Sequence, residues 1–108
     1  MFTLAKDVVK EIDTLFKASP YLHLGGDEVS SACWNLRPEI QNFMNTKNIS
    51  SYGELQMYWR AQIKSVLQPS RKVMFWRNDG KDVTTSGGDI LHFWGSQTDV
   101  AKSTLDPI

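Results

Sequence analysis

The feature that most constrains the fold is an unbroken apolar run at residues 73–76, Val-Met-Phe-Trp, which directly follows two basic residues. An unbroken apolar run is typical of a strand covered on both faces, as in a parallel sheet. Mostly apolar segments at residues 21–24 and 90–94 predict two further strands. We therefore expect a parallel sheet whose strands are connected through helices.

The segments between these strands predict the helices. Residues 2–17 carry apolar side chains at helical spacing, which predicts an amphipathic helix. Pro38 suits a first helical turn and predicts a short helix over residues 38–44. Ser51 and Glu54 form a capping box that starts a longer helix, which runs to about Gln68. Thr98 begins a last short helix toward Leu105.

The helical spacing also predicts which side chains are buried. For the longer helix the buried stripe would be Leu55, Tyr58 or Trp59, Ile63, Val66 and Leu67, and the apolar residues of the amphipathic first helix are Ala5, Val8, Ile12, Leu15 and Phe16. The order of elements is an α/β pattern with right-handed parallel crossovers. Three strands do not close a barrel, and the chain shows neither an internal repeat nor a domain boundary.

Composition excludes several classes of function. Twelve Lys and Arg balance twelve Asp and Glu in 108 residues, so no basic stripe is available for nucleic acid. No apolar run is long enough to span a bilayer, and residues 1–10 lack the features of a signal peptide. His, Cys and carboxylate residues nowhere have metal-ligand spacing, so we expect neither a metal nor a cofactor.

The residues that point to chemistry follow the first predicted strand, where Gly25 and Gly26 precede Asp27 and Glu28. In α/β barrels the active site forms at the C-terminal ends of the strands. Adjacent residues on a strand point to opposite faces, but glycines allow the backbone to leave the strand so that both carboxylates can serve one site. Two close carboxylates resist ionising together, so one can keep a proton and act as a general acid.

Each of these residues also has a purely structural interpretation. The acidic pair can be a turn followed by a helix N-terminus, where negative charge is favourable. Trp76 and Trp94 each end a strand and can present an indole at the same mouth, or they can be core aromatics. His23 and His92 fit core histidines better than catalysts, and Trp34 and Trp59 fit packing residues.

The wider segment resembles glycoside hydrolase family 20, the eukaryotic lysosomal or secreted β-N-acetylhexosaminidases. The similarity lies in residues 23–29, His-Leu-Gly-Gly-Asp-Glu-Val, then Cys33-Trp34 and residues 38–40, Pro-Glu-Ile. It extends over most of the chain, through Trp94. It implies a (β/α)₈ TIM barrel of which residues 1–108 are a fragment that supplies about the fourth to sixth strands.

The resemblance also implies a reaction, the hydrolysis of terminal non-reducing N-acetylhexosamine residues from β-N-acetylhexosaminides. Glu28 would protonate the leaving oxygen and later activate water, while Asp27 would orient the substrate's 2-acetamido group, which acts as the nucleophile with retention of configuration. Trp76 and Trp94 match the tryptophans that wall the acetamido pocket. The family commonly has Trp-Gln-Glu where this chain has Trp-Arg-Asn-Asp at residues 76–79, a departure that bears on substrate preference.

Further expectations also follow from the resemblance. The substrate would be an N-acetylglucosaminide or N-acetylgalactosaminide, the enzyme would be lysosomal or secreted, and the full-length protein would be a dimer. Asn48-Ile49-Ser50 fits the N-glycosylation pattern. Cys33 is either a small buried hydrophobe or half of a disulfide to a cysteine outside this chain, and here its thiol should be free.

Length limits what the chain does by itself. A complete barrel needs about 250 residues, so we expect the isolated chain to have little or no activity. One alternative is a non-catalytic fragment with a residual carbohydrate-binding or assembly role. Another is an unrelated α/β module, in which the residues Asp27, Glu28, Trp76 and Trp94 would not converge.

Overall fold

The computed structural model describes residues 2–77 and 88–93. All the predicted elements within these ranges are present. The helices are α1 (Phe2–Leu15), a 3₁₀ turn (Trp34–Leu36), α2 (Pro38–Thr46) and α3 (Tyr52–Lys64), and the strands are β1 (Tyr21–His23), β2 (Lys72–Arg77) and β3 (Ile90–Phe93). The helix expected near residues 98–105 lies outside the described residues.

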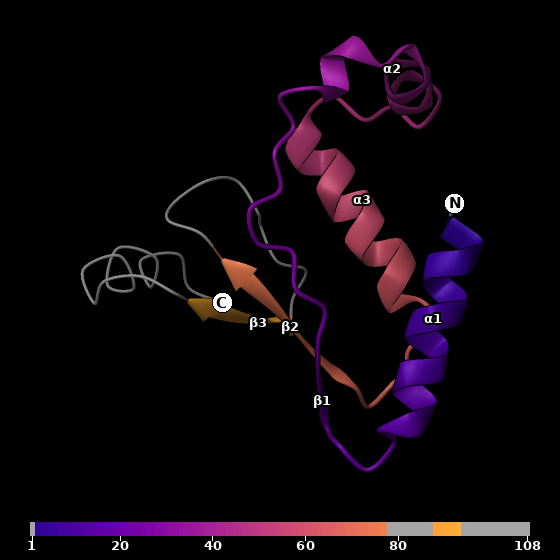
Figure 1. The fold of residues 1–108 in the computed structure, drawn as a ribbon, viewed down its shortest axis with the longest axis vertical. Helices are drawn as coiled ribbons and strands as arrows, with labels where there is room; N and C mark the ends of the chain where they lie inside the picture. The colour runs from indigo at the N-terminus through magenta and orange to yellow at the C-terminus, as the bar shows by residue number, and fades with distance from the viewer. Residues whose placement is uncertain (1, 78–87, 94–108) are drawn as a thin grey trace.

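The strands form a parallel sheet in the order β1-β2-β3, which confirms the predicted α/β architecture. Figure 1 shows α1 and α3 on the same side of the strands. Val73 and Phe75, each 3% exposed, face this helical layer, and the Arg60 guanidinium of α3 lies 4.2 Å from the centre of the Phe75 ring. Met74 and Trp76 alternate to the opposite face and are only partly covered, so within the described residues β2 is buried only on the side that faces the helices.

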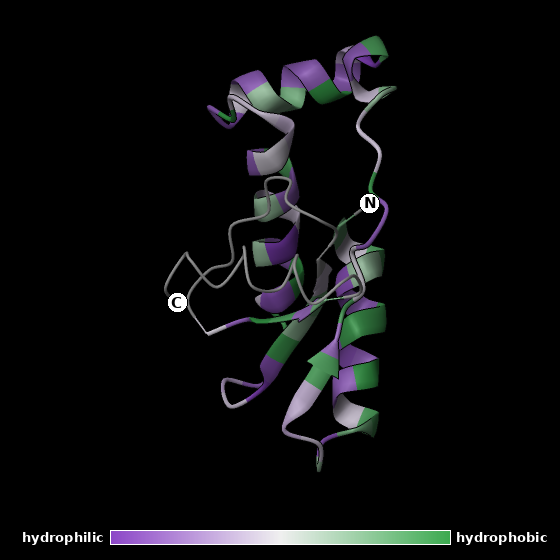
Figure 2. Ribbon diagram, turned by 90° about the vertical axis from the view of Figure 1, so that its left-hand side faces the viewer, coloured by the Kyte–Doolittle hydropathy of each residue, from purple (hydrophilic) through white to green (hydrophobic). Residues whose placement is uncertain are grey.

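Apart from Ala5, the apolar side that the sequence indicates for α1 is exposed. Val8, Leu15 and Phe16 are 48%, 70% and 61% exposed, and the buried residue of the helix is Asp13. The side that faces the protein carries Phe2, Ala5, Lys6, Val9 and Asp13. Figure 2 shows hydrophobic and hydrophilic residues following one another along α1. The orientation follows from polar contacts, since a buried ion pair holds the helix at Asp13.

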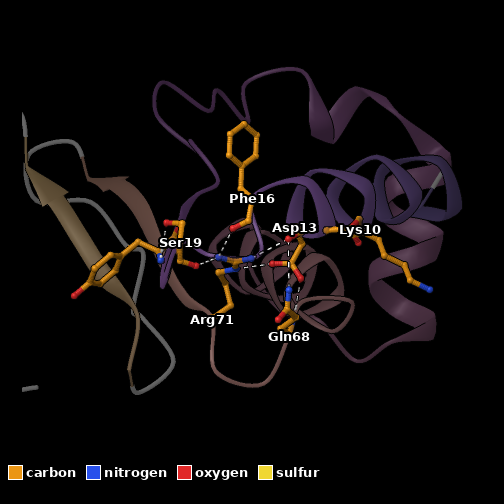
Figure 3. Close-up of polar contacts among 8 residues, drawn as sticks. Lys10, Asp13, Phe16, Ser19, Gln68 and Arg71 are labelled. Carbon is orange, nitrogen blue, oxygen red and sulfur yellow. Dashed lines mark hydrogen bonds and ion pairs between the residues drawn. The ribbon is translucent and has the colours of Figure 1, made fainter.

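Asp13 and Arg71 form that ion pair, which fastens the end of α1 to the start of β2 (Figure 3). The Arg71 Nε lies 2.5 Å from the Asp13 carboxylate, and the guanidinium also donates to the main-chain carbonyls of Asp13, Phe16 and Ser19. The main-chain N–H of Gln68 donates to the second carboxylate oxygen at 3.1 Å. The network lies where β1 and β2 begin, at the opposite end of the sheet from Asp27 and Glu28.

Helix α3 begins as predicted and ends earlier. The Ser51 hydroxyl accepts from the Glu54 N–H at 3.1 Å, and the Glu54 carboxylate accepts from the N–H of Ser50 at 2.7 Å, one residue before the one that a standard capping box uses. The helix ends at Lys64 rather than near Gln68. Its buried residues are Ile63, as predicted, and Arg60, which the apolar pattern did not indicate.

Candidate active site

The main chain leaves the sheet at the two glycines, which follow β1 and Leu24. The ladder continues past His23, because the Leu24 N–H donates to the Met74 carbonyl and the Trp76 N–H donates to the Gly25 carbonyl, both at 2.9 Å. Gly25 and Gly26 then take φ values of +70° and +89°, a region that favours glycine. This is the backbone break that the sequence predicts between the strand and the acidic pair.

Space at Gly26 is tight, because the end of the Arg60 side chain would have to shift to admit a methyl group there. A Cβ atom added at Gly26 would lie 3.0 Å from the Arg60 Nη2 atom and 3.7 Å from the Phe75 ring. At Gly25 the same atom would meet nothing within 4 Å, so only the backbone conformation favours glycine there. The turn is thus pressed against the helical layer on one side.

Asp27 and Glu28 follow the turn, and both side chains are exposed. Glu28 itself has a φ of 51°, a left-handed conformation that is uncommon for a residue with a side chain and that clusters at functional sites. Both carboxylates are therefore accessible to a ligand.

Trp76 packs in a cluster of three rings drawn from all three strands. Its indole stacks on His92 with 3.8 Å between ring centroids and lies 4.8 Å from His23. The His23 Nδ1 accepts a hydrogen bond from the Gly25 N–H at 3.0 Å. Burial and the charge of His92 lower the pKa of His23, and the charge of Asp27 raises it by less.

The cluster was only partly predictable. His92 is exposed and stacked on Trp76, so its interpretation as a core histidine is wrong. The signal that could have found it is the parallel register, which places Trp76 opposite His92. Trp94, the second tryptophan of the predicted pocket, lies outside the described residues.

A cavity of about 630 Å³ lies on the other side of the turn, between the main chain and the helices. Its lining is mainly apolar and does not include Asp27, Glu28 or Trp76, so it is distinct from the ring cluster. Arg60 lines its wall, and both terminal nitrogens of this buried guanidinium lack a hydrogen-bond partner among the described residues. Burial lowers the pKa of Arg60.

Other residues named from the sequence have simpler surroundings. Cys33 is exposed and free, so it is not a buried hydrophobe. Trp34 packs edge-on against Tyr52, and Trp59 packs on Phe2 although it is 40% exposed. Within residues 2–77 and 88–93, no three His, Cys, Asp or Glu side chains come together as they would around a metal, and none of the helices has the length and apolarity of a membrane span.

Comparison with known proteins gives one consistent result. Residues 1–106 match the glycosyl hydrolase family 20 catalytic domain. Rat β-hexosaminidase subunit beta is 32% identical over 91 residues, which are 82% of this chain and 17% of that protein. The chitooligosaccharidolytic β-N-acetylglucosaminidase of Bombyx mori is 37% identical over 60 residues, 54% of this chain and 10% of that protein.

The structural comparison agrees with the sequence comparison. A chitobiase of Flavobacterium johnsoniae superimposes with a TM-score of 0.58 at 26% identity, over 86% of this chain and 15% of that one. The chain spans less than a fifth of the length of each of these relatives. Because the match covers residues 1–106 of the 108-residue chain, the chain belongs to glycosyl hydrolase family 20, within its catalytic domain.

Proposed function

We propose that these 108 residues are the acid-pair segment of a β-N-acetylhexosaminidase barrel and supply about its fourth to sixth strands. In the complete enzyme the segment serves the removal of terminal non-reducing N-acetylhexosamine residues from β-N-acetylhexosaminides. The observation that carries the proposal is the glycine turn, which delivers Asp27 and Glu28 from the C-terminal end of β1, next to Trp76. Barrel enzymes assemble their active sites at this end of the strands.

The two carboxylates take different parts in the reaction. The carbonyl oxygen of the substrate's 2-acetamido group attacks the anomeric carbon, while the protonated Glu28 gives its proton to the departing glycosidic oxygen. Asp27 orients the acetamido group and stabilises the positive charge that develops on the resulting oxazoline-like ring. Glu28, now ionised, takes a proton from water as that water opens the ring, so configuration is retained and Glu28 is protonated again.

Trp76 forms one wall of the pocket for the acetamido group, with Trp94 as the second wall. Support comes from the position of Trp76, whose main-chain N–H is bonded to Gly25 two residues before Asp27. Stacking on His92 and packing against His23 restrict the indole, which favours a fixed apolar wall over a mobile side chain.

The isolated chain should have little or no activity, because the remaining strands are needed to close the barrel and to hold the sugar. The exposed apolar surface of α1, with Leu4, Leu15 and Phe16 each more than 60% exposed, supports this view. A surface of this kind suits contact with further protein. The relatives include proteins named as α and β subunits of β-hexosaminidase, and we extend the proposal to an assembled, lysosomal or secreted enzyme.

The test is a chimaera in which these residues replace the matching segment of rat β-hexosaminidase subunit beta, assayed with a chromogenic N-acetylglucosaminide. We expect turnover by the chimaera, little or none by the isolated chain, and a loss of at least about a hundredfold on Glu28→Gln. Glu11→Gln, an exposed change on α1, is the matched control and should leave the rate unchanged.

The opposite result is equally clear. A folded chimaera without turnover, shown by a normal thermal transition, would contradict the proposal and favour the non-catalytic alternative. Turnover that survives Glu28→Gln would remove Glu28 from its role.

A further inference from the structure

We propose that His23 is a positioning residue, whose ring holds the glycine turn that delivers Asp27 and Glu28 and does so only when it is neutral with its proton on Nε2. The consequence for catalysis rests on the proposed function. The hydrogen bond and its dependence on protonation stand on geometry alone.

The decisive contact is the hydrogen bond from the Gly25 N–H to the His23 Nδ1, at 3.0 Å. A backbone N–H can donate only to a ring nitrogen that carries no proton, and a neutral imidazole carries one proton in all. The proton of His23 is therefore on Nε2, a buried atom without a hydrogen-bond partner among the described residues.

Gly25 is held on both sides by this arrangement. Its N–H is bonded to His23, and its carbonyl accepts from the Trp76 N–H at 2.9 Å. These two bonds fix the peptide groups that flank the φ of +70° at Gly25, where the chain turns away from the sheet. The ring thus acts on the carboxylates through the main chain, and nothing else in the described residues is bonded to the Gly25 N–H.

The surroundings of the ring favour its neutral form. Trp76 and His92 pack against it, with centroid distances of 4.8 and 5.5 Å. Burial lowers the pKa of His23, the charge of His92 on β3 lowers it further, and the charge of Asp27 in the turn raises it by less. These are the titratable groups that face the ring from the described elements.

Protonation would break the contact. A histidinium donates from both nitrogens, so its Nδ1–H would confront the Gly25 N–H instead of accepting from it. The turn would lose one of the two hydrogen bonds that hold Gly25. A shift of about 1 Å in a catalytic group can lower a rate by about a hundredfold. Asp27 and Glu28 would then be misplaced although neither residue is changed.

Two substitutions separate the acceptor from the titrating ring. His23→Asn keeps an acceptor, because an asparagine side chain bonds the N–H two residues on in an Asx turn, and it does not titrate. His23→Leu fills a similar space without an acceptor. His92→Asn is the matched control, because it removes a neighbouring charge and leaves the bond to Gly25 in place.

The experiment is nuclear magnetic resonance on the purified chain, which needs no enzymatic activity. The imidazole nitrogen signals should report a bare Nδ1 in His23 at neutral pH, and the Gly25 amide should move with the same midpoint as the His23 ring on acidification. His23→Asn should abolish that movement and keep the Gly25 amide protected from exchange, whereas His23→Leu should lower the protection by about tenfold.

The inference is overturned by a proton on Nδ1 at neutral pH, by a Gly25 amide that ignores the titration of the ring, or by loss of protection in His23→Asn. The wild-type titration decides the matter even where His23→Leu fails to fold. An inactive chimaera with the tautomer and the Gly25 response intact would contradict the proposed function and leave this inference standing.

Discussion

Replacing Asp13 by asparagine should destabilise the chain more than any other single change of charge on α1. The substitution keeps the shape of the side chain and removes the charge that faces Arg71. The two side chains are 4% and 2% exposed, so water cannot take the place of the lost carboxylate. The guanidinium is then left buried without a counter-charge.

The magnitude follows from the contacts that remain. Removing one partner of a buried ion pair typically costs about 3–5 kcal/mol. The guanidinium would still donate to the carbonyls of Asp13, Phe16 and Ser19, so the cost should lie near the lower end, at about 3 kcal/mol. Domains of this size are stable by only about 5–15 kcal/mol, so the unfolding transition should fall by about 12–20 °C.

Urea unfolding followed by circular dichroism measures this difference. Asp7→Asn is the matched control, because Asp7 is exposed on the same helix and its substitution should change stability by less than about 0.5 kcal/mol. The pair Asp13→Leu with Arg71→Met should be less destabilised than Asp13→Asn alone, since it leaves no buried charge. Equal stability of Asp13→Asn and Asp7→Asn would refute the argument.

Four further outcomes are expected. Burial alone would raise the pKa of Asp13, but its hydrogen bonds hold the pKa below the ordinary value of 3.8. The stability that the carboxylate contributes is therefore complete above about pH 4 and is lost as the pH falls below that value. The urea midpoint should decrease with pH over this range, and a midpoint that does not change with pH would contradict the argument. Gly26→Ala should cost about 1–3 kcal/mol and clearly more than Gly25→Ala, because only the first adds a steric conflict. Arg60→Met should be neutral or stabilising in the same assay, because it removes a buried guanidinium without hydrogen-bond partners among the described residues. Ser51→Ala should cost about 1 kcal/mol through loss of the helix cap, and an unchanged midpoint would deny the cap its role.

The parts of the fold that were predictable are those written in local patterns. The unbroken apolar run at residues 73–76 became the central strand of a parallel sheet, and Ser51 caps α3 as expected. The glycine pair marks the exit from β1, because no other residue takes φ values of +70° and +89° so readily. Each of these signals depends on a few neighbouring residues.

The predictions of buried residues failed where contacts between residues far apart in the sequence determine which side of a helix is buried. The apolar spacing of α1 indicates a side that includes Val8 and Leu15, but these residues are exposed, because a partner 58 residues away fixes the orientation of this helix through Asp13. Arg60 is buried in α3 because it lies over Phe75 and beneath Gly26, contacts that no helical periodicity contains.

In the candidate site, too, the predictable features are local in the sequence and the unpredictable ones depend on tertiary structure. Asp27 and Glu28 could be named from the turn that precedes them, whereas the stacking of His92 on Trp76 depends on strand register. The bond between His23 and Gly25 spans two residues, but an isolated histidine before two glycines does not reveal which nitrogen is the acceptor.

The measurement that tests the central claim most directly compares two aryl β-glycosides that differ only at C2, one with a 2-acetamido group and one with a 2-hydroxyl group. The chimaera should hydrolyse the acetamido substrate, leave the hydroxyl substrate essentially untouched, and lose activity on the former with Glu28→Gln or Asp27→Asn. Similar rates on both substrates, or acetamido turnover that persists in both variants, would contradict the assignment of the nucleophile to the substrate and of its two partners to Asp27 and Glu28.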